Sequence, residues 1–274
     1  MSKIVWDAIG EHFFETGTKN GVLYPYNKTT GKYAPGVAWN GLTAATETPE
    51  GAEANDTYAD DMKYLTLYSP ETFKGTIEAL SYPDEWKACD GSEDVAAGVT
   101  LGQQGRQTFG FCFRTAIGND IEGQDLGYKL HLWYGCKASP SERSYATIND
   151  SPEPITFSWE VTTTPIAVEG HKPLSTITID STKVDGAKLT SFLNTLYGTN
   201  GTDSYSAVSP VGTENPRTEG WYERSGTSPD YVYTLTTDTS VDNQKTYYAK
   251  TTTGGTDAEL PMPADVIRHF EISG

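Results

Sequence analysis

Several features that mark membrane proteins, secreted proteins and disulfide-rich domains are missing from this sequence. No apolar run approaches the roughly 20 residues that a membrane-spanning helix needs. The first residues contain no apolar segment followed by a small-residue cleavage site, so we expect the protein to be made and used in a cytoplasm. The three cysteines, Cys89, Cys112 and Cys136, are odd in number and far apart, which predicts reduced thiols rather than a disulfide framework or a zinc knuckle.

Motifs of catalysis are also missing. The four histidines are scattered without metal-ligand spacing, and the sequence contains no nucleophile elbow, phosphate-binding loop or dinucleotide-binding turn. Adjacent acids such as Asp60 and Asp61 could serve a glycosidase, but neighbours are expected by chance among 37 acids. Residues 118–125 carry oxygen ligands without the spacing of a calcium loop, which favours a turn between two strands. The sequence therefore predicts no catalytic residue, no cofactor and no metal site.

Basic residues are scarce. The chain has 20 Lys and Arg against 37 Asp and Glu, a formal net charge of −17. Such a balance argues against a surface that follows a nucleic-acid backbone, since that surface needs clustered cations. In a confined passage the same charge would repel a polyanion.

What the sequence does contain is β-strand patterning. Residues 155–162 alternate apolar and polar, and so do 109–114, where Phe109, Phe111 and Phe113 share one face. In 128–136 the alternation predicts one face with Tyr128, Leu130, Leu132, Tyr134 and Cys136 and another with Lys129, His131 and Trp133. Shorter strands are expected at 73–80 and 175–179. This spacing is typical of an antiparallel sandwich or barrel.

Two helices are predicted, with a third turn possible at 83–86. Asp185 can cap a segment whose apolar residues repeat at helical spacing and which ends before Gly198. A shorter helix is expected to begin near Pro263, with Val266, Ile267 and Phe270 on one side.

Two stretches differ from this scaffold. Residues 39–62 contain six acids and no Lys or Arg, and they lack a clean period, which predicts a long acidic loop. Such a loop is either a solvated charge run or a segment for assembly or binding. Residues 199–258 are rich in Ser, Thr, Gly and Tyr, with short strands expected at 220–223, 231–236 and 245–248. A small β-module inserted into a surface connection explains them best.

A series of short motifs runs along the chain in a fixed order. They are KIVWD at 3–7, GVLYP at 21–25, GVAWNGL at 36–42, YADD at 58–61, SYPDE at 81–85, GVTLGQQ at 98–104, IGND at 117–120, GYKLHL at 127–132, NDSPE at 149–153, FSWEVTTTP at 157–165 and LPMP at 260–263. In these motifs the chain resembles the major tail proteins of siphophages that infect Gram-positive bacteria, and the resemblance is collinear over residues 3–198 and 259–270.

The resemblance implies a mainly β fold, a tail-tube-type sandwich or barrel with one or two short helices. Residues 1–198 and 259–274 would form the tail tube domain, with 199–258 as the inserted β-module. Subunits of this family join into rings, usually hexamers, and the rings stack into the tube through which DNA is ejected. The implied location is the virion tail, assembled in the host cytoplasm.

The resemblance also implies partners and contact residues. The partners are further copies of the chain, a tape measure protein in the lumen, and tail-tip and terminator proteins, with DNA only in transit and no membrane. The segment that matches the family's inter-subunit loop carries Trp39, Glu47, Glu50, Glu53, Asp56, Tyr58, Asp60 and Asp61. Tail tubes generally have an acidic lumen, with which the net charge agrees.

The inserted module departs from the family pattern, in which the helix leads quickly into the Leu-Pro-x-Pro ending. It is similar to small β-modules of phage tail proteins, and we expect it on the outside of the tube. Two alternatives remain open from the sequence: the inner tube of a contractile tail or phage-derived particle, and a surface carbohydrate-binding β-module. Aromatic residues such as Trp221 and Tyr231 would suit sugar stacking, although strand-spaced aromatics are more often a small core.

Overall fold

The computed structural model describes residues 4, 6–145, 147–148, 150, 153–209, 214–228, 230–242 and 244–271. The chain divides into two compact units. The main unit comprises Met1–Tyr197 and Ala258–Gly274, and the inserted unit comprises Gly198–Asp257. Both junctions lie one residue earlier than the boundaries expected from the sequence.

The fold is mainly β, as the strand patterning predicts. The strands of the main unit are β1 (Phe14–Asn27), β2 (Lys32–Tyr33), β3 (Val37–Trp39), β4 (Leu42–Glu50), β5 (Ala54–Ala59), β6 (Met62–Tyr68), β7 (Thr72–Ala79), β8 (Glu93–Ala96), β9 (Val99–Leu101), β10 (Phe109–Asn119), β11 (Gly123–Ala138), β12 (Phe157–Thr163) and β13 (Thr176–Asp180). Nine of them form one sheet of order β2-β1-β10-β11-β12-β7-β4, in which β3 also pairs with β1 and β13 with β11. Within the described residues the sheet stays open and does not close into a barrel.

The sheet folds over itself, so that one of its faces, the inner face, packs in two layers around an aromatic core. Trp159 of β12 contacts Trp39 of β3, with ring centroids 5.5 Å apart. Trp133 of β11 contacts Phe73 of β7 at 5.3 Å. Aromatic pairs at such distances add to the stabilisation that burial of their large surfaces provides. The expected face of 109–114 is confirmed, since Phe109, Phe111 and Phe113 lie in this core. The face expected for 155–162 is confirmed from Phe157 onward, whereas Ile155 precedes β12 and is 40% exposed.

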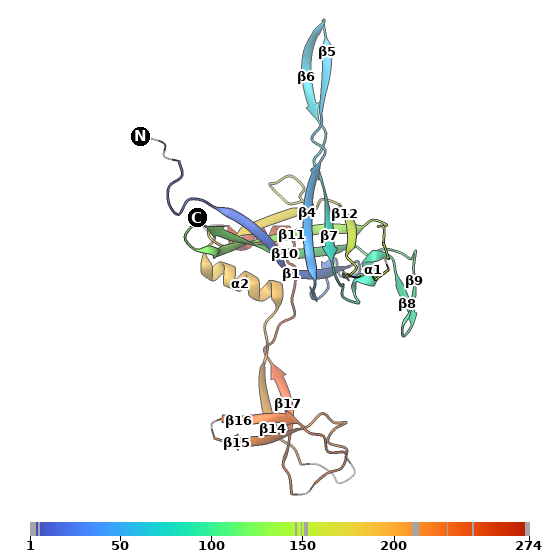
Figure 1. Ribbon diagram of the computed structural model, residues 1–274, viewed down its shortest axis with the longest axis vertical. Coiled ribbons are helices and arrows are strands. Elements are labelled where there is room, and N and C mark those ends of the chain that lie inside the picture. The colour runs from blue at the N-terminus through green and yellow to red at the C-terminus, as the bar shows by residue number, and fades with distance from the viewer. Residues whose placement is uncertain are drawn as a thin grey trace. The chain divides into compact units, whose positions relative to one another are not determined.

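The opposite, outer face of the sheet packs against two helices, of which Figure 1 shows α2. Helix α2 (Gly186–Tyr197) begins where the Asp185 carboxylate accepts hydrogen bonds from the backbone N–H groups of Ala187 and Lys188, at 3.0 and 2.9 Å. Helix α3 (Pro263–Phe270) starts at the expected proline. A third helix, α1 (Trp86–Asp90), follows the possible turn at 83–86, so the main unit has one helix more than the one or two expected.

A β-bulge at Gly135 overturns one expectation for β11. The pairing steps two residues along β10, from Phe109 to Phe111, but three along β11, from Cys136 to Trp133. Gly135 has φ +60°, and a Cβ there would lie 2.3 Å from the carbonyl oxygen of Thr164. The extra residue inverts the alternation beyond it. Cys136 therefore points into the inner core instead of sharing the outer face with Tyr134.

The prediction of a long loop at 39–62 is wrong. Trp39 ends β3, β4 pairs with β7 at the edge of the main sheet, and β5 pairs with β6 in a two-stranded ribbon. The pairing of β4 with β7 ends at Glu50 opposite Thr72, and that of β5 with β6 begins at Ala54 opposite Tyr68. One antiparallel ribbon thus runs on beyond the sheet (Figure 1). Acidic residues and alanines hid this strand pattern because they contribute no apolar alternation.

The inserted unit is a four-stranded sheet of order β14-β17-β15-β16. Its strands are β14 (Thr202–Ala207), β15 (Tyr222–Thr227), β16 (Asp230–Leu235) and β17 (Tyr247–Thr253). The three strands expected from the sequence correspond to β15, β16 and β17, whereas β14, with the sequence TDSYSA and Tyr205 as its one large apolar residue, is not predicted by the pattern. No helix of the described residues in either unit is both long and apolar enough to cross a membrane.

Candidate functional site

The distal part of the ribbon is the candidate assembly element, and we name β5, β6 and their turn (residues 54–68) the hairpin arm. Every residue of β5 and β6 is exposed except Thr66, which is half-buried. The turn is tight, because Ala59 pairs with Met62 and the two residues between them, Asp60 and Asp61, have φ of +51° and +59°. Both central residues in the left-handed region are the mark of a type I′ hairpin turn.

The two faces of the hairpin arm differ in chemistry. On one face Asp56 forms an ion pair with Lys63 at 2.8 Å and accepts a hydrogen bond from Thr66 at 2.7 Å. On the other face, strand alternation places Leu65 and Leu67, which are 39% and 61% exposed. A lone two-stranded hairpin is marginally stable in water. Within the described residues nothing covers this side, so Leu65 and Leu67 are open to solvent.

The structure separates the eight residues expected to contact another subunit. Trp39 is a core residue, 2% exposed, whose Nε1 donates to the carbonyl oxygen of Ser81, so it is not available for contact. Glu47 lies in β4 of the main sheet, where its side chain is 36% exposed. Glu50 lies at the end of β4 and forms an ion pair with Lys74 at 2.8 Å. The remaining five lie exposed in or just before the hairpin arm: Glu53, Asp56, Tyr58, Asp60 and Asp61.

A polar cluster closes one end of the inner core, near the base of the ribbon. Trp133 Nε1 donates to Glu47 Oε1 at 2.8 Å, which ties β4 to β11. His131 is stacked on Phe113 with ring centroids 4.6 Å apart. Its Nδ1 lies 3.4 Å from Glu47 and its Nε2 lies 3.5 Å from Glu15, so the ring stands between two carboxylates. The cluster joins the first strand, the central strands and the base of the ribbon.

The carboxylates of this cluster are held in their charged forms. The His131 side chain and the hydrogen bond from Trp133 hold the pKa of Glu47 below its ordinary value, against the opposing effect of burial. Burial raises the pKa of Glu15, but hydrogen bonds from Lys129 and Thr115 outweigh it and leave that pKa lowered. The sequence could not reveal this cluster because Glu15, Glu47 and His131 are far apart along the chain.

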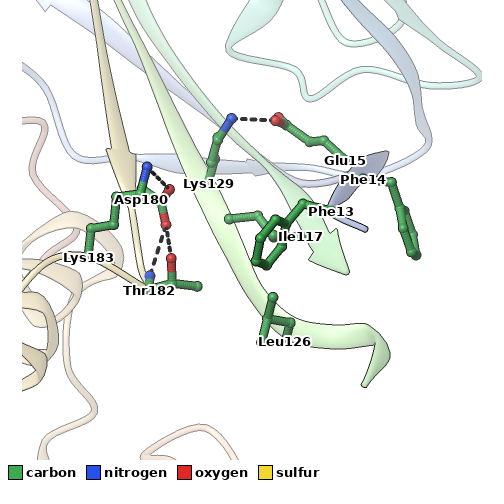
Figure 2. A pocket seen from close by; sticks show the side chains of 9 residues that line it. All are labelled: Phe13, Phe14, Glu15, Ile117, Leu126, Lys129, Asp180, Thr182 and Lys183. Carbon is green, nitrogen blue, oxygen red and sulfur yellow. Dashed lines mark hydrogen bonds and ion pairs between the residues drawn. The ribbon is translucent and has the colours of Figure 1, made fainter. Parts of the chain in front are cut away.

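Beyond the polar cluster the inner face of the sheet carries a cavity of about 400 Å³, which we name the end groove (Figure 2). Its apolar lining consists of Ile117 of β10, Phe13, which lies just before β1, and Leu126 of β11. The rim holds two ion pairs, Lys129 with Glu15 at 2.6 Å and Lys183 with Asp180 at 3.5 Å. The inner face is thus covered by β4 and β7 at Trp133, whereas beside Ile117 it carries the cavity. The lining was not predicted, because β1 shows no alternation in the sequence.

The segment before β1 is exposed and apolar. Trp6 and Ile9 are 75% and 84% exposed. The segment is fixed by Asp120, whose carboxylate accepts hydrogen bonds from the backbone N–H groups of Gly10 and His12. Asp120 lies in the turn between β10 and β11, so the expectation of a turn at 118–125 is confirmed.

Two stretches of strand in the main sheet have a free edge. From Phe14 to Asn20, β1 pairs with β10 on one side, and within the described residues no strand lies on the other, since β3 begins its pairing at Gly21. β13 likewise pairs with β11 alone. Both stretches expose backbone N–H and C=O groups that another strand could pair with.

The aromatic side chains of the inserted unit largely contact one another. Tyr247 is fully buried beside Trp221, and Tyr248 is 7% exposed. Tyr205 stacks on Tyr233 with ring centroids 3.9 Å apart. These contacts confirm the expectation of a small core and leave few open ring faces for a sugar.

The three cysteines are buried and free, as the sequence predicts. Within the described part of the chain, no three His, Cys, Asp or Glu side chains are grouped to hold a metal ion. Comparison of the sequence with models of known protein families, and with curated proteins, gives no match.

Proposed function

We propose that this chain is a structural subunit that assembles with copies of itself into stacked rings, forming the tail tube of a phage. The observation that carries the proposal is the hairpin arm, which presents Leu65 and Leu67 to solvent on a two-stranded ribbon. A monomer gains nothing from such an element, whereas a neighbouring copy would bury its apolar side. The resemblance of the sequence to siphophage major tail proteins supplies the kind of assembly, a hexameric ring in a stack.

The free strand edges give the ring a means of closure. An exposed edge promotes association until it is paired, and a ring pairs every edge without leaving one open. In this proposal β13 of one copy lies beside the first part of β1 of the next. The hairpin arm then contacts another copy in the same ring or in the adjacent ring.

The proposed role is that of a conduit without catalysis. The net charge of −17 supports passage of DNA without adhesion, because a channel lined with acids repels a polyanion. The expected partners are further copies of the chain, the tape measure protein, and the tail-tip and terminator proteins. The proposed location is the tail of the virion.

The inserted unit belongs on the outside of the tube in this proposal, because a 60-residue unit in the lumen would obstruct the channel. Its two ends are held together by the paired backbones of Thr199 and Thr256. Removal of residues 199–258, joining Gly198 to Glu259, is expected to leave tube formation intact. Loss of tubes with a folded main unit would overturn the external placement.

Negative-stain electron microscopy of the full chain, beside size-exclusion chromatography at low and high concentration, tests the proposal. Hollow rings or tubes of uniform diameter are the expected result. A chain that remains monomeric at every concentration, including in a mixture with isolated tail tips, would count against self-assembly.

A further inference from the structure

The end groove and the hairpin arm are two unmatched apolar surfaces of the same unit. We propose that the end groove of one copy receives the apolar side of the hairpin arm of a second copy. The inference rests on the proposed self-assembly and names the surface that the arm contacts.

The first support is the continuity of the ribbon. Its base, β4 and β7, covers the inner face of its own sheet, where Phe73 contacts Trp133 and Glu47 accepts a hydrogen bond from the same ring. Its distal part, the hairpin arm, covers nothing in its own copy. The end groove is the part of the inner face that the ribbon leaves open. Arm and groove together would repeat between two copies the contact that β4 and β7 make within one.

The second support is the form of the groove. Phe13, Leu126 and Ile117 give the groove an apolar floor, in which Phe13 is 64% exposed, Leu126 is half-buried and Ile117 is 8% exposed. Charged side chains stand around this floor in the ion pairs of Lys129 and Lys183. An apolar centre inside a polar rim is the usual anatomy of a protein interface. Leu65 and Leu67 of the arm match the floor in chemistry.

The third support is charge. Glu53, Asp60 and Asp61, in and beside the arm, form no ion pair with any described residue. At the groove the Lys183 side chain is 80% exposed, while its partner Asp180 is 19% exposed and accepts hydrogen bonds from Thr182 at 2.9 and 2.6 Å. The outward charge on this part of the rim is therefore positive. An acidic tip and an exposed ammonium group on the rim are complementary.

The competing surface is the hairpin of β8 and β9, where Val95 and Val99 are 58% and 52% exposed. Its local charge is acidic, since the one ammonium group there, that of Lys87, already contacts both Asp84 and Asp94 within 2.9 Å. An acidic arm tip would be repelled from it.

Intermolecular cross-linking distinguishes the two surfaces. Burial raises the pKa of the Cys89 and Cys112 thiols to about 12, and Cys136 is also fully buried. The native thiols therefore react slowly, and disulfides will form between the cysteines introduced on the surface. The test variant carries Leu67→Cys with Phe13→Cys, and the matched control carries Leu67→Cys with Val99→Cys. Each variant with a single introduced cysteine measures the background, which is the disulfide formed between the same position in two copies.

The expected result is a disulfide-linked ladder of the Phe13→Cys variant in the assembled fraction, on a non-reducing gel, and none from the control. Assemblies that cross-link through Val99→Cys, or through neither pair, would overturn the groove as receptor while leaving self-assembly intact. Protein that forms no assemblies at all would overturn both.

A second test of the docking exchanges the charges of Lys183 on the groove rim and Asp61 on the arm. The Lys183 side chain is 80% exposed, so its replacement should not disturb folding. Lys183→Glu is expected to raise the concentration needed for assembly about fivefold, the ratio that corresponds to a rim ion pair of ~1 kcal/mol. Asp61→Lys in the same chain should restore assembly. An unchanged threshold in Lys183→Glu, or no recovery in the double variant, would contradict the docking.

Discussion

The base and the tip of one antiparallel ribbon lie in different surroundings, since β7 of the base is partly buried and the strands of the tip are almost wholly exposed. At the base, β4 and β7 lie over Trp133, and Gly75 passes so close that a Cβ there would meet the indole ring at 2.6 Å. At the tip, the side chains of β5 and β6 are exposed. Both parts consist of paired antiparallel strands, and residues 51–53 and 69–71 separate the two ladders. Backbone pairing is therefore present in both parts, and the side chains packed against the ribbon make the difference. The base packs against Trp133 and belongs to the core, whereas no described residue packs on the tip.

The sharpest test of this contrast removes an aromatic ring from the base and a leucine from the tip. Trp133→Ala is expected to lower the free energy of unfolding by about 3–5 kcal/mol, as loss of a buried aromatic side chain does. Leu67→Ser is expected to change it by less than about 0.5 kcal/mol, because the side chain is exposed, while reducing assembly. Denaturant unfolding of the monomers measures both. A comparable loss of stability in the two variants would show that the arm packs within its own copy.

Overpacking the base should have the next largest effect. Gly75→Ala is expected to cost about 1–3 kcal/mol, because the added methyl group would meet Trp133 and the carbonyl oxygen of Thr46. Gly102→Ala is the matched control, since a Cβ there meets nothing within 4 Å. The shift of the thermal midpoint reports the difference. Equal midpoints would mean that β7 can move away from the indole ring.

The acids of the ribbon should also differ between base and tip. Glu47→Gln is expected to cost about 1 kcal/mol at neutral pH, because it weakens the hydrogen bond from Trp133 and removes the negative charge 3.4 Å from His131 Nδ1. Glu53→Gln, near the arm, should cost nothing measurable, since it removes no ion pair.

The stabilisation that Glu47 provides should also depend on pH. A carboxyl group with a lowered pKa stabilises the fold above its unfolded value and loses this contribution as pH falls through the folded value. The contribution of Glu47 should therefore be complete above about 4.5, its ordinary value, and decline in more acidic solution. Acid unfolding of wild type and Glu47→Gln should converge at low pH. Parallel curves would show that Glu47 is not held charged by its neighbours.

The smallest effect is expected at the turn of the arm. Asp61 has φ +59°, which glycine adopts at less cost, so Asp61→Gly creates a favoured Asp-Gly turn. The change should slow amide exchange in the arm and leave the global unfolding midpoint unchanged. A shifted midpoint would mean that the arm unfolds together with the core.

The elements that could be predicted from the sequence are those whose two faces meet different environments. Phe109, Phe111 and Phe113 face the aromatic core while Cys112 faces the helices, so the alternation is visible in the residues. Asp185 identifies the start of α2 because its carboxylate has a local capping role. Such signals are contained within a few consecutive residues.

The elements that were missed depend on distant partners or on local irregularities. β1 is one of the longest strands of the main sheet, yet register shifts between Thr16 and Val22 break its alternation. Gly135 inverts the faces of β11 through one inserted residue, which no apolar pattern reveals. The candidate site was only partly predictable. The acids of the arm were visible, but the end groove joins residues from four strands and the segments beside them.

Amide hydrogen exchange of β5 and β6, compared between the free chain and its assembled form, tests the central claim most directly. Backbone groups of an unsupported ribbon open easily, whereas those covered by a second copy do not. The account predicts rapid exchange of these amides in the free chain and strongly slowed exchange in rings or tubes. The same exchange rates in both forms would contradict the assignment of the hairpin arm as the element that joins one copy to the next.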